Sequence, residues 1–161
     1  MLVGFLEFQR ATLELKCTGV DAIGLSTTIE PSSMSLGGLL KHLAFVEDHW
    51  FHRAFADRPA CEPWASVDWS ADPDWDWHSA AGDPPHRLFD LWREAVGRSR
   101  AIVTDALAEP GDPLGQQARQ DVFDGDAPSL RWILLHMVEE YARHNGHADL
   151  LRERIDGTVG E

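Results

Sequence analysis

The chain has 161 residues, of which 43% are hydrophobic and 25% charged, and a formal net charge of −13. This composition is typical of an ordinary globular protein, and the length predicts one domain over residues 1–161. The strong negative charge argues against nucleic acid or an anionic membrane surface as a partner. The sequence contains no run of about 18 apolar residues, so it predicts no membrane-spanning helix.

Cysteine usage and the N-terminus both favour a cytoplasmic protein. Cys17 and Cys61 lack the spacing of a metal or redox motif, and reduced thiols are typical of the cytoplasm. The first ten residues have neither a basic start nor a small-residue cleavage site, so we expect no secretion signal. Neither cysteine is predicted to be a nucleophile.

The first half of the chain predicts two helices. Apolar residues recur at helical spacing over residues 2–17, and glycine and proline then interrupt the pattern over residues 18–31, which predicts a connector. Ser35 is placed to cap a second helix, which we expect to end near Phe55.

Histidines interrupt the apolar face of this second helix. His42 and His49 are seven residues apart and share a face, so spacing alone does not choose between them as a metal ligand. The alternative for either one is an interior histidine that is hydrogen-bonded to a carboxylate such as Glu47 or Glu139.

Residues 57–85 change in character, because proline, aspartate and tryptophan dominate without any helical or alternating period. Long ordered loops in compact domains are often functional, and this one has too many tryptophans for a disordered linker. We expect it to fold back over the bundle, where it either lines a pocket or interface or only covers the core. The tryptophans are Trp64, Trp69, Trp75 and Trp77.

The second half predicts two more helices. One spans residues 86–107, and after a connection over 109–128 the last one spans 129–157, with Ser129 as its cap and Gly157 as its stop. With four helices, two long crossover loops and no strand pattern, the sequence predicts an all-α fold, a four-helix bundle with a site between facing helices.

One stripe of the last helix carries residues that bind metals. His136, Glu140, His144 and His147 are spaced by four, four and three residues, so they fall within about 80° of one another on the helix. Four apolar residues extend the stripe at its ends and predict that it is buried: Trp132, Ile133, Leu150 and Leu151.

Three imidazoles and a carboxylate on a buried face are costly unless something binds them, so the stripe favours a metal ion. Glu140 and His144 are the preferred ligands. Arg143 also lies near the stripe, and an Arg–Glu salt-bridge network on a half-exposed face is the competing interpretation.

Two segments resemble the DinB-like superfamily (DinB/YfiT-like), and specifically an actinobacterial branch related to mycothiol-dependent enzymes. They are residues 35–51 (SLGGLLKHLAFVEDHWF) and residues 129–157 (SLRWILLHMVEEYARHNGHADLLRERIDG). The resemblance implies a four-helix bundle with one divalent metal bound by His42, Glu140 and His144. The superfamily usually has histidine where Glu140 stands, although a glutamate also occurs in relatives that are mycothiol-dependent maleylpyruvate isomerases.

Two imidazoles and one carboxylate suit zinc best, and also nickel, iron or manganese. The resemblance implies an enzyme in which the metal activates a small thiol such as mycothiol, a cosubstrate that then attacks an electrophile. His147 and Glu139 are then candidates for proton transfer. His136 and His147 could orient the metal ligands, and His147 could instead be a fourth ligand.

Three alternatives to the thiol transferase stay open. They are a metal-dependent hydrolase, a non-catalytic stress or interaction protein whose metal holds the bundle together, and a metal-free bundle in which the polar residues form a buried cluster. We also expect a homodimer, because members of this fold often pair through helix faces and the tryptophan-rich loop offers apolar surface.

Overall fold

The computed structural model describes residues 1–123 and 125–160; Asp124 and Glu161, which belong to the predicted connection and to the end of the predicted domain, lie outside the described residues. The α-helices are α1 (Leu2–Cys17), α2 (Ala22–Ser26), α3 (Leu36–Glu47), α4 (Trp75–His78), α5 (Pro85–Ala108) and α6 (Leu130–Asp156). A π-helix, η1 (Asp48–Phe55), continues α3. The three short 3₁₀ turns are η2 (Trp64–Ser66), η3 (Ser79–Gly82) and η4 (Pro113–Gly115). Within these residues the backbone forms two isolated β-bridges and no strand. The predicted all-α fold is confirmed.

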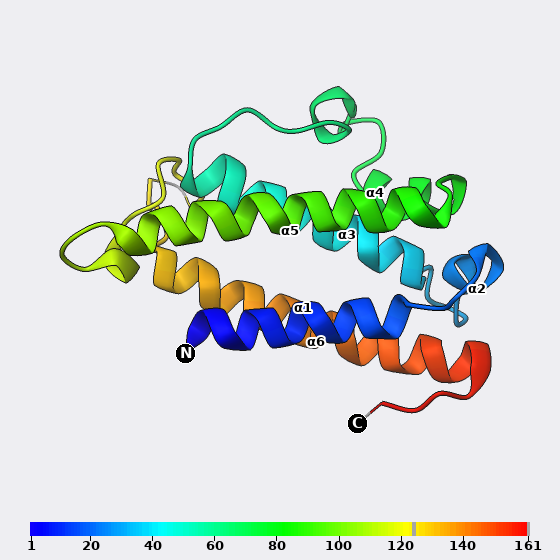
Figure 1. Cartoon of the computed structure of the whole chain (residues 1–161). Coiled ribbons are helices and arrows are strands. Elements are labelled where there is room, and N and C mark those ends of the chain that lie inside the picture. The colour runs from blue at the N-terminus through cyan, green and yellow to red at the C-terminus, as the bar shows by residue number, and fades with distance from the viewer. Residues whose placement is uncertain (124, 161) are drawn as a thin grey trace.

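Four long helices form the bundle as two packed pairs. α1 lies against α6 and α3 lies against α5, and the two pairs stack on each other (Figure 1). Leucine, isoleucine, methionine and aromatic side chains from all four helices fill one continuous core between the pairs. Among the described residues, no helix is both long enough and apolar enough to cross a membrane.

The predicted caps of the bundle helices are confirmed. The Ser35 hydroxyl accepts a hydrogen bond from the Gly38 amide at 3.1 Å, and the Ser129 hydroxyl accepts one from the Trp132 amide at 3.3 Å. At the end of α6, Gly157 adopts a φ of 78°, a left-handed conformation that glycine tolerates best.

The structure contains elements that the sequence did not predict, including short helical turns in both predicted crossover loops. The predicted connector contains α2, which begins where the Asp21 carboxylate accepts a hydrogen bond from the Gly24 amide at 2.8 Å. The second helix does reach Phe55, but beyond Glu47 it continues as the π-helix η1, whose wider turns rotate its side chains relative to α3.

The tryptophan-rich segment folds back over the α3–α5 pair, as expected, and its short helix α4 lies directly on α3 (Figure 1). Gly38 makes this approach possible, since a Cβ atom there would lie only 2.9 Å from Cε3 of Trp77. The Trp64 side chain is buried, so part of the segment covers the core. Trp77 instead stacks on the ring of His42, with ring centroids 4.5 Å apart. The segment therefore also forms one wall of the site described next.

Candidate metal centre

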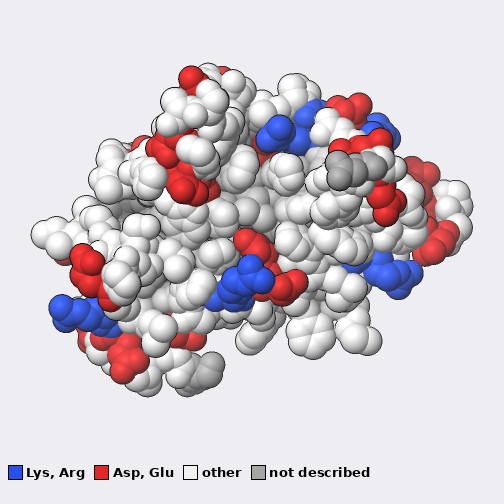
Figure 2. All heavy atoms as spheres, turned by 180° about the vertical axis from the view of Figure 1, so that it is seen from behind, with Lys and Arg blue, Asp and Glu red and all other residues white. Residues whose placement is uncertain are grey.

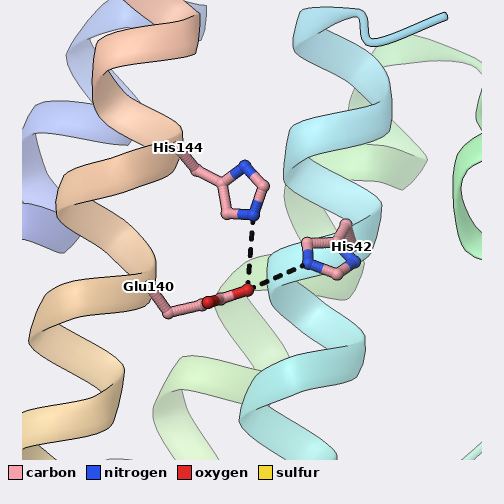
Figure 3. A group of neighbouring side chains, drawn as sticks. All are labelled: His42, Glu140 and His144. Carbon is pink, nitrogen blue, oxygen red and sulfur yellow. Dashed lines mark hydrogen bonds and ion pairs between the residues drawn. The ribbon is translucent and has the colours of Figure 1, made fainter.

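Three polar side chains meet in the gap between α3 and α6. His42 projects from α3, and Glu140 and His144 project from successive turns of α6 (Figure 3). The Oε1 atom of Glu140 lies 3.3 Å from Nε2 of His42 and 3.3 Å from Nε2 of His144. His144 is buried and the other two residues are partly buried.

The spacing and chemistry of these donors fit a divalent metal. Zinc bonds of about 2.0–2.2 Å in tetrahedral geometry place neighbouring ligand atoms about 3.4 Å apart. Two of the three donor pairs already have that separation, and all three donor atoms lie within 4.8 Å of one another. Because two imidazoles and a carboxylate also leave room for a further ligand, the group suits a catalytic ion.

Asp76 orients the α3 histidine. The Nδ1–H of His42 donates to Oδ2 of Asp76 at 2.7 Å, and the Asp76 side chain, on α4, is only 5% exposed. With the proton fixed on Nδ1, the lone pair of Nε2 faces Glu140 and His144. A carboxylate behind a histidine is the usual support of a metal-bound imidazole.

Neighbouring charged groups shift the pKa values of His42 and Glu140. Burial opposes protonation of His42, but hydrogen bonds with Asp76 and Glu140 outweigh burial and raise the pKa of His42. Hydrogen bonds with His144 and His42 hold the pKa of Glu140 well below its usual range. The two carboxylates therefore both favour positive charge at His42, and a cation bound at Nε2 would be stabilised by the same neighbours.

Three histidines of the sequence analysis have other surroundings. His49 packs against Phe45 and Trp50. His136 stacks on Trp132, with ring centroids 5.0 Å apart. The Nδ1 atom of His147 lies 3.3 Å from Nδ1 of His144, which is the nitrogen turned away from Glu140.

The α6 stripe is less buried than predicted. Ile133 and Leu151 are in the core, but Trp132 is 39% and Leu150 is 60% exposed. The predicted Arg–Glu network also exists at its edge, since Arg143 pairs with Glu139 at 2.7 Å and approaches Glu140 at 3.8 Å. The stripe is thus partly exposed, with the Arg–Glu network at its edge, and the metal interpretation stays a prediction.

Sequence reasoning missed Asp76. The two carboxylates expected as partners of a histidine have other partners: Glu47 binds Arg10 and Tyr141, and Glu139 binds Arg143. Asp76 is one of many aspartates in a segment without any period, so no spacing distinguishes it. The only local signal is its position between Trp75 and Trp77, two residues that anchor α4 on the core.

A hollow of about 260 Å³ lies between α6 and the segment before α3. Its walls are mostly apolar, with Ile29, Pro31, Met34, Leu150 and Leu151, and they also include Glu30, Ser32 and His147. Because His147 contacts His144, the hollow and the three-donor group are neighbours.

Comparison with known proteins identifies the family. No curated protein matches the chain. A family model described as mycothiol-S-transferase matches residues 1–157, which is nearly the whole chain, and it confirms the predicted link to mycothiol-dependent enzymes of the DinB-like superfamily. The chain therefore belongs to the mycothiol-S-transferase family.

Proposed function

We propose that this protein is a divalent-metal-dependent S-transferase that joins mycothiol, or a closely similar small thiol, to an electrophile. The observation that carries the proposal is the convergence of His42, Glu140 and His144 at the spacing of metal ligands, with Asp76 behind His42. The family match supports the thiol. A bound zinc-class ion would supply Lewis-acid activation, which lowers the pKa of a coordinated thiol.

The residues around the centre have distinct roles in this proposal. Asp76 holds His42 in one tautomer, and Trp77 covers the His42 ring and limits access of water from the α4 side. The apolar hollow beside His147 is the proposed place for the electrophile. Its small size and apolar walls favour a compact uncharged molecule over a highly charged one.

Proton transfer is assigned to His147. It lines the hollow and contacts His144, whereas the Glu139 side chain is 66% exposed and already paired with Arg143. The thiol S–H bond breaks as His147 takes the proton. The thiolate then forms a C–S bond with the electrophilic carbon while the bond to the leaving group breaks.

The position of His147 also favours an enzyme over a purely structural metal site. His147 contacts Nδ1 of His144, so it does not belong to the group formed by the three donor atoms. A fourth coordination position is then left for a substrate atom, as catalytic sites require.

The test combines metal content with thiol transfer. Metal per chain is measured after purification without chelating resin, and mycothiol is mixed with a fluorogenic alkyl chloride, which yields a thioether and chloride. We expect His42→Ala to lose one equivalent of metal relative to the wild type and to reduce the rate to the uncatalysed background. His78→Ala is the matched control, since His78 lies in the same region but pairs with Asp72 and is 57% exposed.

Two results would overturn the proposal. One is a wild type that transfers the thiol equally well after complete metal removal. The other is metal-dependent ester hydrolysis without any thiol transfer, which would instead favour the hydrolase.

A further inference from the structure

A second group of metal-binding side chains lies away from the His42 centre, at the far end of the α3–η1 helix. Asp48 and His52 come from η1, and Cys61 comes from the segment that follows it. Their ligand atoms, an oxygen, a nitrogen and a sulfur, all lie within 4.8 Å of one another.

The carboxylate of Asp48 is the unusual member of this group. The residue is 1% exposed, and neither carboxylate oxygen accepts a hydrogen bond of ordinary geometry among the described residues, although the Cys61 thiol is near enough to interact with it. The Nδ1 atom of His52 is also shielded from solvent and likewise lacks a partner within the described chain. Buried polar groups are nearly always satisfied, and an unpaired buried carboxylate is especially costly. Something that the protein atoms do not supply is expected to bind there.

The local fold explains why these donors converge. Asp48 and His52 are four residues apart, which is close to one full turn of a π-helix, the helix type with i+5 hydrogen bonds. Their side chains therefore lie on one side of the helix. The chain then reverses after Phe55 and brings Cys61 back beside them. The three residues therefore join η1 to the beginning of the tryptophan-rich segment.

Arg98, on α5, is the competing partner. Its positive charge acts on both His52 and Cys61, and Arg58 also acts on His52. The Nε atom of Arg98 is itself buried and unpaired among the described residues, so a water shared by Arg98 and Asp48 would satisfy both groups. That arrangement, however, does not use the imidazole beside the carboxylate, and the single S–H of Cys61 can donate to only one of the two Asp48 oxygens.

We propose that Asp48, His52 and Cys61 form a second divalent-metal site, of the zinc class, that fastens the segment around Cys61 to η1. Thiolate, imidazole and carboxylate are the three ligand types that zinc takes in proteins. Neighbouring ligand atoms around zinc are about 3.5 Å apart, so side-chain adjustments of about 1 Å would complete the geometry. On binding, the Cys61 S–H bond breaks, the metal–sulfur bond forms and the proton passes to solvent.

Cobalt distinguishes this site from the first one. The His42 centre contains no cysteine, so only ligation by Cys61 gives a cobalt–thiolate charge-transfer absorption in the near ultraviolet. Metal-free protein titrated with Co²⁺ should show this absorption in the wild type and in His42→Ala. It should vanish in Cys61→Ala and persist in Cys17→Ala, which is the control because Cys17 is the only other cysteine. No such absorption, or one that survives Cys61→Ala, would overturn the proposal.

Two further measurements test the proposal even if the Cys61→Ala variant misfolds. In the unmutated protein, Zn²⁺ should slow alkylation of Cys61 at least tenfold. Asp48→Asn preserves the size of the side chain and removes its charge, so it should weaken Co²⁺ binding at this site at least tenfold. Equal binding by Asp48→Asn with native circular dichroism, or alkylation that Zn²⁺ does not slow, would show that Arg98 and water satisfy Asp48 instead.

Discussion

Asp76 is the side chain on which the orientation of His42 depends. Asp76→Asn preserves its shape but replaces the charged acceptor of the 2.7 Å hydrogen bond with a weaker one. We expect metal affinity at the His42 centre to fall about 10–100-fold, which is the usual effect of losing the carboxylate behind a ligating histidine. Affinity is measured by competition with a chromophoric chelator.

The control for this prediction is Asp72→Asn. Asp72 makes an equivalent contact with His78 in the same segment, at 2.9 Å, but at an exposed position. The two variants should therefore differ by at least tenfold in affinity. Equal affinities would mean that the packing of Trp77, rather than the Asp76 carboxylate, holds His42.

Cys17 gives the protein a pH dependence at the alkaline end. Burial raises the pKa of Cys17 from 9.0 to about 12. A raised folded-state pKa contributes stability that is complete below pH 9.0 and is lost as the pH rises toward 12. Between pH 8 and 10 the wild type should lose about 1.4 kcal/mol of unfolding free energy more than Cys17→Ala. Urea unfolding at several pH values measures this, and parallel curves would contradict the prediction.

Part of the candidate site could be predicted from single residues. The spacing of Glu140 and His144 on α6 is a local property, and a helical period reveals it. The choice between His42 and His49 needed the family resemblance, because both lie on one face of the second helix. Asp76 depends on how α4 lies on α3, which is a tertiary contact that no local pattern encodes.

Long helices with caps were predictable from the sequence, and short or irregular ones were not. α6 shows its start and end in Ser129 and Gly157. In contrast, α2 has only five residues and contains Gly24, so propensity alone does not favour it. The change from α3 to η1 is a change in hydrogen bonding over eight residues, too few for the apolar spacing to distinguish the two periods.

A buried polar network joins the elements of the bundle. Arg10 on α1 donates two hydrogen bonds to Glu47 on α3, at 2.8 and 2.7 Å. The Tyr141 hydroxyl on α6 donates to Glu47 at 2.8 Å and accepts from Trp92 of α5 at 2.9 Å. Burial opposes the charge of Arg10, but Glu47 outweighs it and raises the pKa of Arg10. All four bundle helices thus meet at one ion pair.

Removing only one member of the Arg10–Glu47 pair should lower the free energy of unfolding. Arg10→Met leaves the fully buried Glu47 without its cation, and we expect a loss of about 3–5 kcal/mol in unfolding free energy. Arg10→Met combined with Glu47→Gln should cost less than the sum of the two single changes, since neither charge then remains. Arg93→Met is the control, because the Arg93–Glu14 pair is exposed and should contribute less than about 1 kcal/mol. Additive losses would contradict the coupling.

One face of the molecule carries dispersed charge. On the face in Figure 2, separate acidic groups lie with a few basic ones between them, so the negative charge on this face does not gather into one patch. The tryptophan-rich segment packs on the core, whereas large exposed apolar side chains lie on α1, among them Phe5, Phe8 and Leu15. The homodimer stays a prediction, and the exposed apolar side chains of α1 and of α6, the latter including Leu135 and Leu150, are candidates for its surface.

Metal binding at the His42 centre should stabilise the whole bundle, because its ligands come from both helix pairs. His42 belongs to the α3–α5 pair, and Glu140 and His144 belong to the α1–α6 pair. A ligand that binds only the folded state at 100 times its dissociation constant adds about 2.7 kcal/mol. For a domain of this size that corresponds to a rise in melting temperature of about 5–11 °C.

The comparison is cleanest in a Cys61→Ala background, which removes the second proposed site. There, zinc should raise the melting temperature of the otherwise unchanged protein and leave that of the additional His42→Ala variant unchanged. Equal gains in both proteins would mean that zinc stabilises the bundle from somewhere other than the gap between α3 and α6. A gain confined to protein with His42 would show that the two helix pairs are linked through this centre.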